Sequence, residues 1–100
     1  MLSIKKTAKG RFEAVSNGET LGVITFVSNG DTMTVKRLEA DDSGILDGLL
    51  RAAAASEAKA HIVLDCHVDA AFFEQAGLCE VFTGNIAKTN DLFSHKKCGG

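Results

Sequence analysis

The stretch Lys36–Ala55, KRLEADDSGILDGLLRAAAA, joins a strand pattern to an amphipathic helix. Between the two lies an acidic corner, residues 40–44, in which Asp42 or Ser43 can cap the helix. Six apolar residues then recur at helical spacing and predict one buried stripe: Ile45, Leu46, Leu49, Leu50, Ala53 and Ala54. Open backbone N–H groups at the start of a helix can hold an anion, so this corner is the first candidate for a ligand site.

The residues before this stretch predict a three-stranded antiparallel meander. Its strands are expected at Arg11–Val15, Thr20–Val27 and Thr32–Glu39, and a shorter strand at Leu2–Ile4 can precede them. The turns between the three strands both contain an Asn-Gly pair, which supplies the positive φ angles of a tight hairpin. The middle strand carries apolar residues on both faces, which predicts that both faces are covered.

The residues after the helix predict a second half built around a buried strand. His61–Cys66 has an apolar centre typical of a strand that runs parallel to an earlier one, which makes strand, helix and strand a right-handed crossover. Asp69 can cap a short helix, Ala70–Ala76, that ends at Gly77. Cys79–Thr83 is expected to form the last strand.

Length and composition limit the class of protein. The chain has 100 residues, which predicts a single domain, and residues 85–100 are expected to form a partly ordered tail in which Leu92 and Phe93 dock back. A net charge of −2 argues against nucleic acid as the main partner, and no apolar run is long enough to cross a membrane. The basic cluster near the start of the chain lacks interleaved aromatic residues and is interpreted as a solvated face: Lys5, Lys6, Lys9 and Arg11.

The three cysteines favour a reducing compartment and no metal site. Cys66, Cys79 and Cys98 match no CxxC spacing, so we expect a cytoplasmic protein. Cys66 and His67 are adjacent and cannot easily face one ion, whereas His95 and Cys98 have a tolerable ligand spacing. Buried cysteines and surface histidines are the ordinary explanation, so no zinc site is predicted.

The order of these elements and two local sequences resemble the GNAT superfamily of acyl-CoA-dependent N-acyltransferases. Ser43–Ala52, SGILDGLLRA, is similar to the pyrophosphate loop and the start of the cofactor helix in that family. Ala71–Leu78, AFFEQAGL, is similar to a later signature of the family. The resemblance implies a compact GNAT-like α/β domain: an antiparallel meander followed by a helix, a parallel strand, a short helix and a final strand.

The resemblance also implies an activity and a set of site residues. It implies an N-acetyltransferase-like protein that binds acetyl-CoA or another acyl-CoA and transfers the acyl group to an amine. The backbone amides of four residues would hold the pyrophosphate: Ser43, Gly44, Ile45 and Leu46. Leu38 and Ala40 would pair with the pantetheine arm, and Glu39 would act as the general base.

The departures from the family pattern support an alternative. Asp41, Asp42 and Asp47 place three carboxylates around the phosphate loop, where they would repel a phosphate. Phe73 stands where family members often have a tyrosine that protonates the leaving thiolate. Cys66, His67 or Cys79 would have to supply this proton instead, but the sequence does not place any of them at the site. The alternative is a non-catalytic binding or regulatory module of the same fold, which has lost acyl-CoA binding and could form a homodimer.

Overall fold

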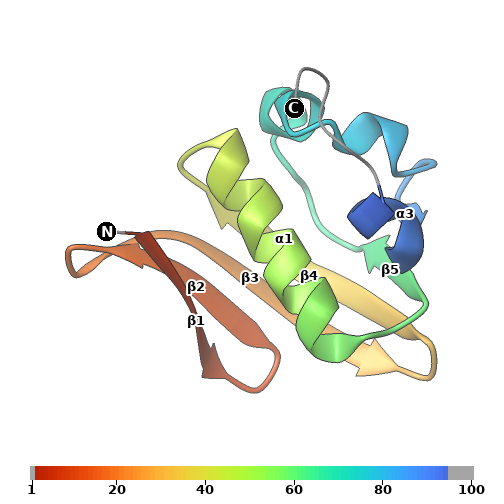
Figure 1. Cartoon of the computed structure of the whole chain (residues 1–100), viewed down its shortest axis with the longest axis horizontal. Helices are drawn as coiled ribbons and strands as arrows, with labels where there is room; N and C mark the ends of the chain where they lie inside the picture. The colour runs from red at the N-terminus through yellow and green to blue at the C-terminus, as the bar shows by residue number, and fades with distance from the viewer. Residues whose placement is uncertain (1, 95–100) are drawn as a thin grey trace.

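The computed structural model describes residues 2–94, which form a mixed α/β fold with one six-stranded sheet and three helices (Figure 1). The strands lie side by side in chain order: β1 (Leu2–Ala8), β2 (Arg11–Ser16), β3 (Glu19–Asn29), β4 (Thr32–Ala40), β5 (His61–Leu64) and β6 (Ile86–Lys88). The first four strands are antiparallel, β5 is parallel to β4, and β6 is antiparallel to β5. The predicted meander and the parallel strand after it are therefore confirmed, and β1 extends the meander by one strand.

The turns of the meander use residues that tolerate a positive φ. Asn17 and Gly18 have φ angles of 53° and 83°, and Gly30 has a φ angle of 60°. The turn between β1 and β2 depends on Gly10, whose φ angle is 74° and whose carbonyl oxygen accepts the N–H of Phe26 at 2.9 Å. A Cβ at residue 10 would lie 2.5 Å from the carbonyl oxygen of Phe26, so only glycine fits there.

Helix α1 (Ser43–Glu57) covers one face of the sheet and forms the core with it (Figure 1). The side chain of Asp42 caps it, since Oδ1 accepts the N–H of Ile45 at 2.8 Å. The predicted apolar stripe of the helix is buried throughout. The helix packs tightly against the sheet at Gly22, where a Cβ would lie 2.9 Å from both the carbonyl oxygen of Glu39 and Cδ1 of Leu49.

The face of β3 that points away from α1 is covered only in part. Val23 is buried on that face, but Leu21 is half-buried and Val27 is 53% exposed. The other two helices contact α1 rather than the opposite face of the sheet. The prediction that both faces of this strand are covered is therefore wrong at Val27, near the end of the strand.

The second helix of the chain forms as the sequence predicts. Helix α2 (Ala70–Gln75) is capped by Asp69, whose Oδ1 accepts the N–H of Phe72 at 3.0 Å. Gly77 follows with a φ angle of 77°, which ends the helical turn.

The prediction of a last strand at Cys79–Thr83 is wrong, because a 3₁₀ turn, η1 (Leu78–Glu80), begins there. Leu78, Val81 and Phe82 are all buried, and their spacing of three and four residues turns one helical face toward the core. The last strand of the described residues is β6, which lies in the segment that was expected to be a tail.

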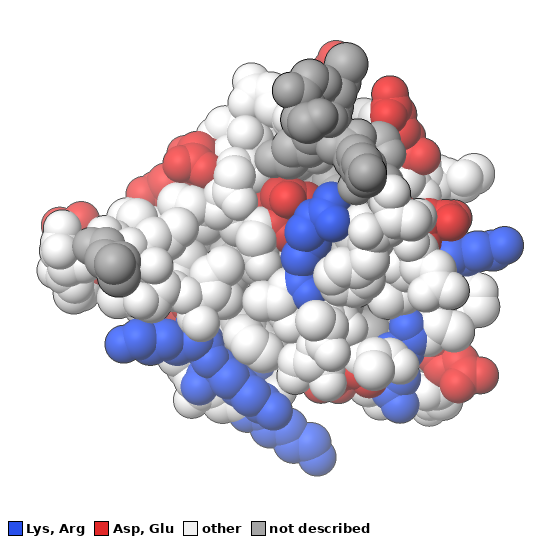
Figure 2. All heavy atoms as spheres, in the orientation of Figure 1, with Lys and Arg blue, Asp and Glu red and all other residues white. Residues whose placement is uncertain are grey.

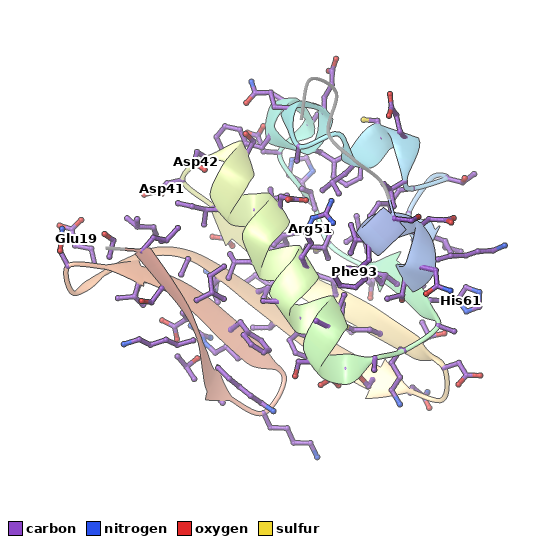
Figure 3. The ribbon with its side chains drawn as sticks, in the orientation of Figure 1. Glu19, Asp41, Asp42, Arg51, His61 and Phe93 are labelled. Atoms are coloured by element: carbon purple, nitrogen blue, oxygen red, sulfur yellow. The ribbon has the colours of Figure 1, made fainter. Side chains whose placement is uncertain are left out.

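Helix α3 (Thr89–Ser94) follows β6 and is attached to α1 through Arg51 (Figure 3). The Arg51 guanidinium donates Nη1–H to the carbonyl oxygen of Leu92 at 2.7 Å, and its Nε lies 2.9 Å and 3.0 Å from the two carboxylate oxygens of Asp47. Leu92 is fully buried, whereas Phe93 is 47% exposed, so only Leu92 docks as predicted. The rest of the expected tail, with His95 and Cys98, lies outside the described residues.

The close approach at Gly22 predicts a specific loss of stability. Gly22→Ala should lower the free energy of unfolding by about 1–3 kcal/mol, because the new methyl group meets backbone and core atoms that cannot easily move. Gly48→Ala is the matched control: its Cβ would meet only the flexible end of Ile4, and alanine in a helix gains up to about 1 kcal/mol over glycine. Urea unfolding measures both values, and equal stability of the two variants would contradict the proposed contact.

Candidate functional site

The candidate site lies where β4 and β5 separate. Their pairing ends at Val35 and Leu64, and the N–H of Asp65 donates to the carbonyl oxygen of Val35 at 2.8 Å as the last bond between them. Strand β4 continues to Ala40, while the chain after Asp65 turns away toward α2. The final part of β4 therefore has an open edge in the middle of the sheet.

The register of β3 and β4 shows which backbone groups face this open edge. The N–H of Asp41 donates to the carbonyl oxygen of Leu21 at 2.9 Å, so Gly22 and Ala40 form a non-hydrogen-bonded pair of the antiparallel ladder. Because the pattern alternates, the N–H and C=O groups of Ala40 and Leu38 point away from β3, toward the gap beside β5. The resemblance to the GNAT superfamily implies that these two residues would pair with the pantetheine arm.

A cavity of about 240 Å³ occupies this gap. Its lining combines predicted residues of β4 and α1 with residues that follow β5: Leu38, Glu39, Ala40, Leu46, His67, Asp69 and Phe72. The volume is below the usual range for a whole drug-sized ligand. It can hold the narrow end of a ligand, such as an acyl group on a thioester, whereas a nucleotide would have to lie outside it.

The four backbone amides predicted to hold a pyrophosphate are not equally available. The N–H of Ile45 donates to Oδ1 of Asp42 at 2.8 Å, and the N–H of Leu46 donates to the carbonyl oxygen of Asp42 at 3.1 Å. Of the four, this leaves the N–H groups of Ser43 and Gly44, which precede both the capping bond and the first intrahelical bond. A phosphate would have to use these two groups or displace the side chain of Asp42.

The acidic corner carries two exposed aspartates. Asp41 and Asp42 are exposed beside the start of α1 (Figure 3), and none of the salt bridges within residues 2–94 involves either of them. Nearby cations are already paired: Lys36 lies 2.7 Å from Asp65, and Arg37 lies 2.7 Å from Glu39.

The expectation of a third carboxylate at the corner is wrong for Asp47. Its side chain is only 11% exposed and forms a salt bridge with Arg51, one turn further along α1. The charge that a bound phosphate would meet at the corner comes from two aspartates.

Glu39 is held by an ion pair on the face of β4 opposite Leu38. Its carboxylate accepts Nε–H of Arg37 at 2.7 Å and Nη2–H at 3.3 Å. This hydrogen bond, and then the charge of Arg37, lower the pKa of Glu39 below its ordinary value. Glu39 is therefore ionised at neutral pH, but it is a weaker base than an unpaired carboxylate.

Two of the three alternative proton donors lie near the cavity. His67 lines it, and Cys66 is half-buried beside the backbone of Leu38. Burial, followed by the charge of Asp65, raises the pKa of the Cys66 thiol, and the backbone of Leu38 offsets part of this effect. Phe73 packs against Phe82 with ring centroids 5.4 Å apart and has no proton to give.

The third alternative donor, Cys79, is exposed in η1 and is absent from the cavity lining. Within residues 2–94, no three metal-capable side chains come together. Nor is any helix in that range long and apolar enough to span a membrane.

Sequence reasoning did not place His67, Asp69 and Phe72 in the site. A usable signal was present, because β4 and β5 are parallel and their carboxyl ends therefore meet at the same edge of the sheet. Applied to the predicted parallel strand, this rule would have brought the residues after β5 to the corner after β4.

Comparisons with known proteins support the fold. No protein-family model matches the chain, and no curated protein matches its sequence. Among solved structures, the crystal structure of a point mutant of TTHA1254 from Thermus thermophilus is similar, with a TM-score of 0.56 and 28% sequence identity. The match covers 77% of this chain and 65% of that chain, so this chain spans less than two thirds of TTHA1254. The name of TTHA1254 states no activity.

The Arg37–Glu39 pair predicts a pKa change. Arg37→Ala should raise the pKa of Glu39 toward its ordinary value, because the hydrogen bond and the positive charge are both removed. NMR titration of the side-chain carboxyl carbon measures this shift. A carboxyl whose pKa is lowered by folding adds stability above its unfolded pKa and loses it as pH falls through the folded pKa, so this dependence on acid pH should weaken in the variant.

Lys36→Ala is the control for this experiment. In the wild-type protein the ammonium group of Lys36 lowers the pKa of Asp65. Its removal should therefore raise the pKa of Asp65 and leave the pKa of Glu39 unchanged. An unchanged pKa of Glu39 in Arg37→Ala would show that the ion pair does not control it.

Proposed function

We propose that the chain is a compact GNAT-like N-acyltransferase that binds acetyl-CoA or another acyl-CoA at the gap between β4 and β5. The observation that carries the proposal is the open edge of β4, where the backbone groups of Leu38 and Ala40 face a cavity beside the start of α1. The order of antiparallel strands, helix, parallel strand and short helix supports a GNAT-like architecture. The likeness to TTHA1254 supports the same fold class without adding an activity.

The binding mode follows from the groups at the site. The amides of the pantetheine arm would add to the edge of β4 at Leu38 and Ala40, as an extended peptide adds to a sheet. The acyl end would enter the cavity against Leu46 and Phe72, and the pyrophosphate would lie near the amides of Ser43 and Gly44.

The proposed reaction is attack by an amine nitrogen on the thioester carbonyl carbon. A C–N bond forms and the C–S bond breaks, so one proton leaves the amine and the sulfur of the leaving group gains one. Glu39 would take the first proton, through water since its side chain lies on the other face of β4, and His67 would supply the second. The acceptor amine is not assigned.

A second candidate is a non-catalytic binding or regulatory module of the same fold. Two contacts favour it: the side chain of Asp42 accepts the N–H of Ile45, and Arg37 donates a hydrogen bond to the carboxylate of Glu39. Both contacts compete with the groups that an acyl-CoA and its reaction need. The acyltransferase proposal predicts acyl-CoA binding and release of free thiol, whereas the non-catalytic module predicts no thiol release.

A titration with acetyl-CoA tests the acyltransferase proposal. Binding should shift the amide NMR signals of Leu38, Ala40, Ser43 and Gly44, and ligand at ten times its dissociation constant should stabilise the fold by about 1.4 kcal/mol. The absence of any shift at millimolar acetyl-CoA would contradict the proposal. Binding without release of free thiol in the presence of primary amines would favour the non-catalytic module.

The acidic corner predicts a variant that binds acyl-CoA more tightly. Asp41→Arg should lower the dissociation constant about tenfold at low salt, because it replaces a charge that repels phosphate with one that attracts it. Asp31→Arg makes the same charge change in the turn before β4, at the other end of that strand, and should leave the affinity nearly unchanged. Weaker binding by Asp41→Arg would place the phosphate elsewhere.

A further inference from the structure

A larger cavity lies at the other end of α1, away from the acidic corner. It measures about 480 Å³, which is within the range of small-molecule pockets. It is an open hollow bordered by the last turn of α1, the loop into β5, the end of β6 and α3. Within residues 2–94 its lining is Ala54, Ala55, Ala58, Lys59, Ala60, His61, Lys88, Thr89, Asn90 and Phe93. Figure 3 shows His61 and Phe93 on this side of the molecule.

Half of the described lining residues are apolar. Four alanines form one side of it, and Phe93 on α3 exposes 47% of its surface. Ala58 has a φ angle of 51°, a left-handed conformation that usually belongs to glycine, so a methyl group is present at a position where none is expected. An apolar group can lie against the alanines and remove the ring of Phe93 from water.

The two lysines that line the cavity come from separate parts of the chain. Lys59 lies in the loop between α1 and β5, Lys88 is the last residue of β6, and His61 lies between them in the sequence. Among residues 2–94, no carboxylate lines the cavity and no salt bridge involves either lysine. The whole chain carries a net charge of −2, so this local excess of positive charge runs against the overall charge and favours an anion.

Thr89 supplies an independent indication. It is only 9% exposed, and its buried hydroxyl has no hydrogen-bond partner among the described residues. A buried hydroxyl without a partner is unfavourable. Thr89 also lines the cavity, and a rotation about χ1 to another staggered position would turn its hydroxyl toward an acceptor there.

We propose that this cavity binds a small organic carboxylate that carries an aromatic group. The carboxylate lies at the rim formed by Lys59 and Lys88, with the hydroxyl of Thr89 as a further donor, and the ring lies against the alanines and Phe93. The site is separate from the gap between β4 and β5, since the two cavities share no lining residue. It does not depend on whether acyl-CoA binds.

Benzoate is the probe for this site, followed by amide NMR shifts. It should shift the signals of Ala58, Ala60 and Asn90 in a saturable way, with a dissociation constant on the order of a millimolar for a ligand of this size. Benzyl alcohol has the ring without the charge, and acetate has the charge without the ring. Each should bind at least about fivefold more weakly, because it loses one half of the interaction.

Three variants make the test specific to this cavity. Ala55→Leu fills the cavity from an exposed helical position and should abolish the shifts without unfolding the protein. Lys59→Ala and Lys88→Ala should each weaken benzoate binding about two- to fivefold, an effect that salt also reproduces. As a control, Lys6→Ala removes a lysine from the basic β1–β2 hairpin, which Figure 2 shows at the lower left, and should change nothing.

The opposite results would overturn the proposal. These are no saturable shift, equal binding of benzoate and benzyl alcohol, or shifts that survive in Ala55→Leu. An equal loss of affinity in Lys6→Ala and Lys88→Ala would also overturn it, because it would mean that benzoate binds to positive charge in general.

Discussion

The position of α1 on the sheet depends on its close contact with β3 at Gly22. No larger residue fits there, because the space is already filled by the carbonyl of Glu39 and by side chains of the helix. Gly22 also pairs with Ala40, the last residue of β4. The packing of α1 against Gly22 therefore determines how close the start of the helix lies to the end of that strand. The corner between them is consequently only two residues long, Asp41 and Asp42, and Asp42 must serve as the cap.

The same arrangement leaves two opposing features at one site. The separation of β4 from β5 leaves the backbone groups of Leu38 and Ala40 without a neighbouring strand. The backbone of Leu38 is hydrogen-bonded to the Cys66 side chain, whereas the backbone groups of Ala40 need water or a ligand as partner. The charges beside this edge work against an anionic ligand, since Asp41 and Asp42 take part in no salt bridge within residues 2–94 while Lys36 and Arg37 are engaged. Backbone geometry therefore favours an extended ligand, and the side chains limit its affinity.

Features set by a few neighbouring residues could be predicted from the sequence, and those set by distant contacts could not. The Asn-Gly turns, the stripe of α1 and the caps at Asp42 and Asp69 depend on local spacing, and they form as expected. Val81 and Phe82 favour a strand by composition, but tertiary packing places them on one helical face with Leu78. The cavity beside β4 depends on the crossover that brings His67 near Ala40: the strand pattern predicts the crossover, but the size and lining of the cavity depend on side-chain packing that no local pattern encodes.

The charges at the two ends of α1 have different explanations. Carboxylates at a helix start and cations near its end both stabilise the helix dipole, so Asp41, Asp42 and Lys59 would be favourable even in a protein that binds nothing. The acidic corner is therefore weak evidence against acyl-CoA. Lys88 is different, because it belongs to β6 and contributes nothing to the first or last turn of α1. Lys88 and Lys59 line the same cavity, where no carboxylate of residues 2–94 is present. Helix stability does not explain this arrangement, which is the stronger reason to expect an anion there.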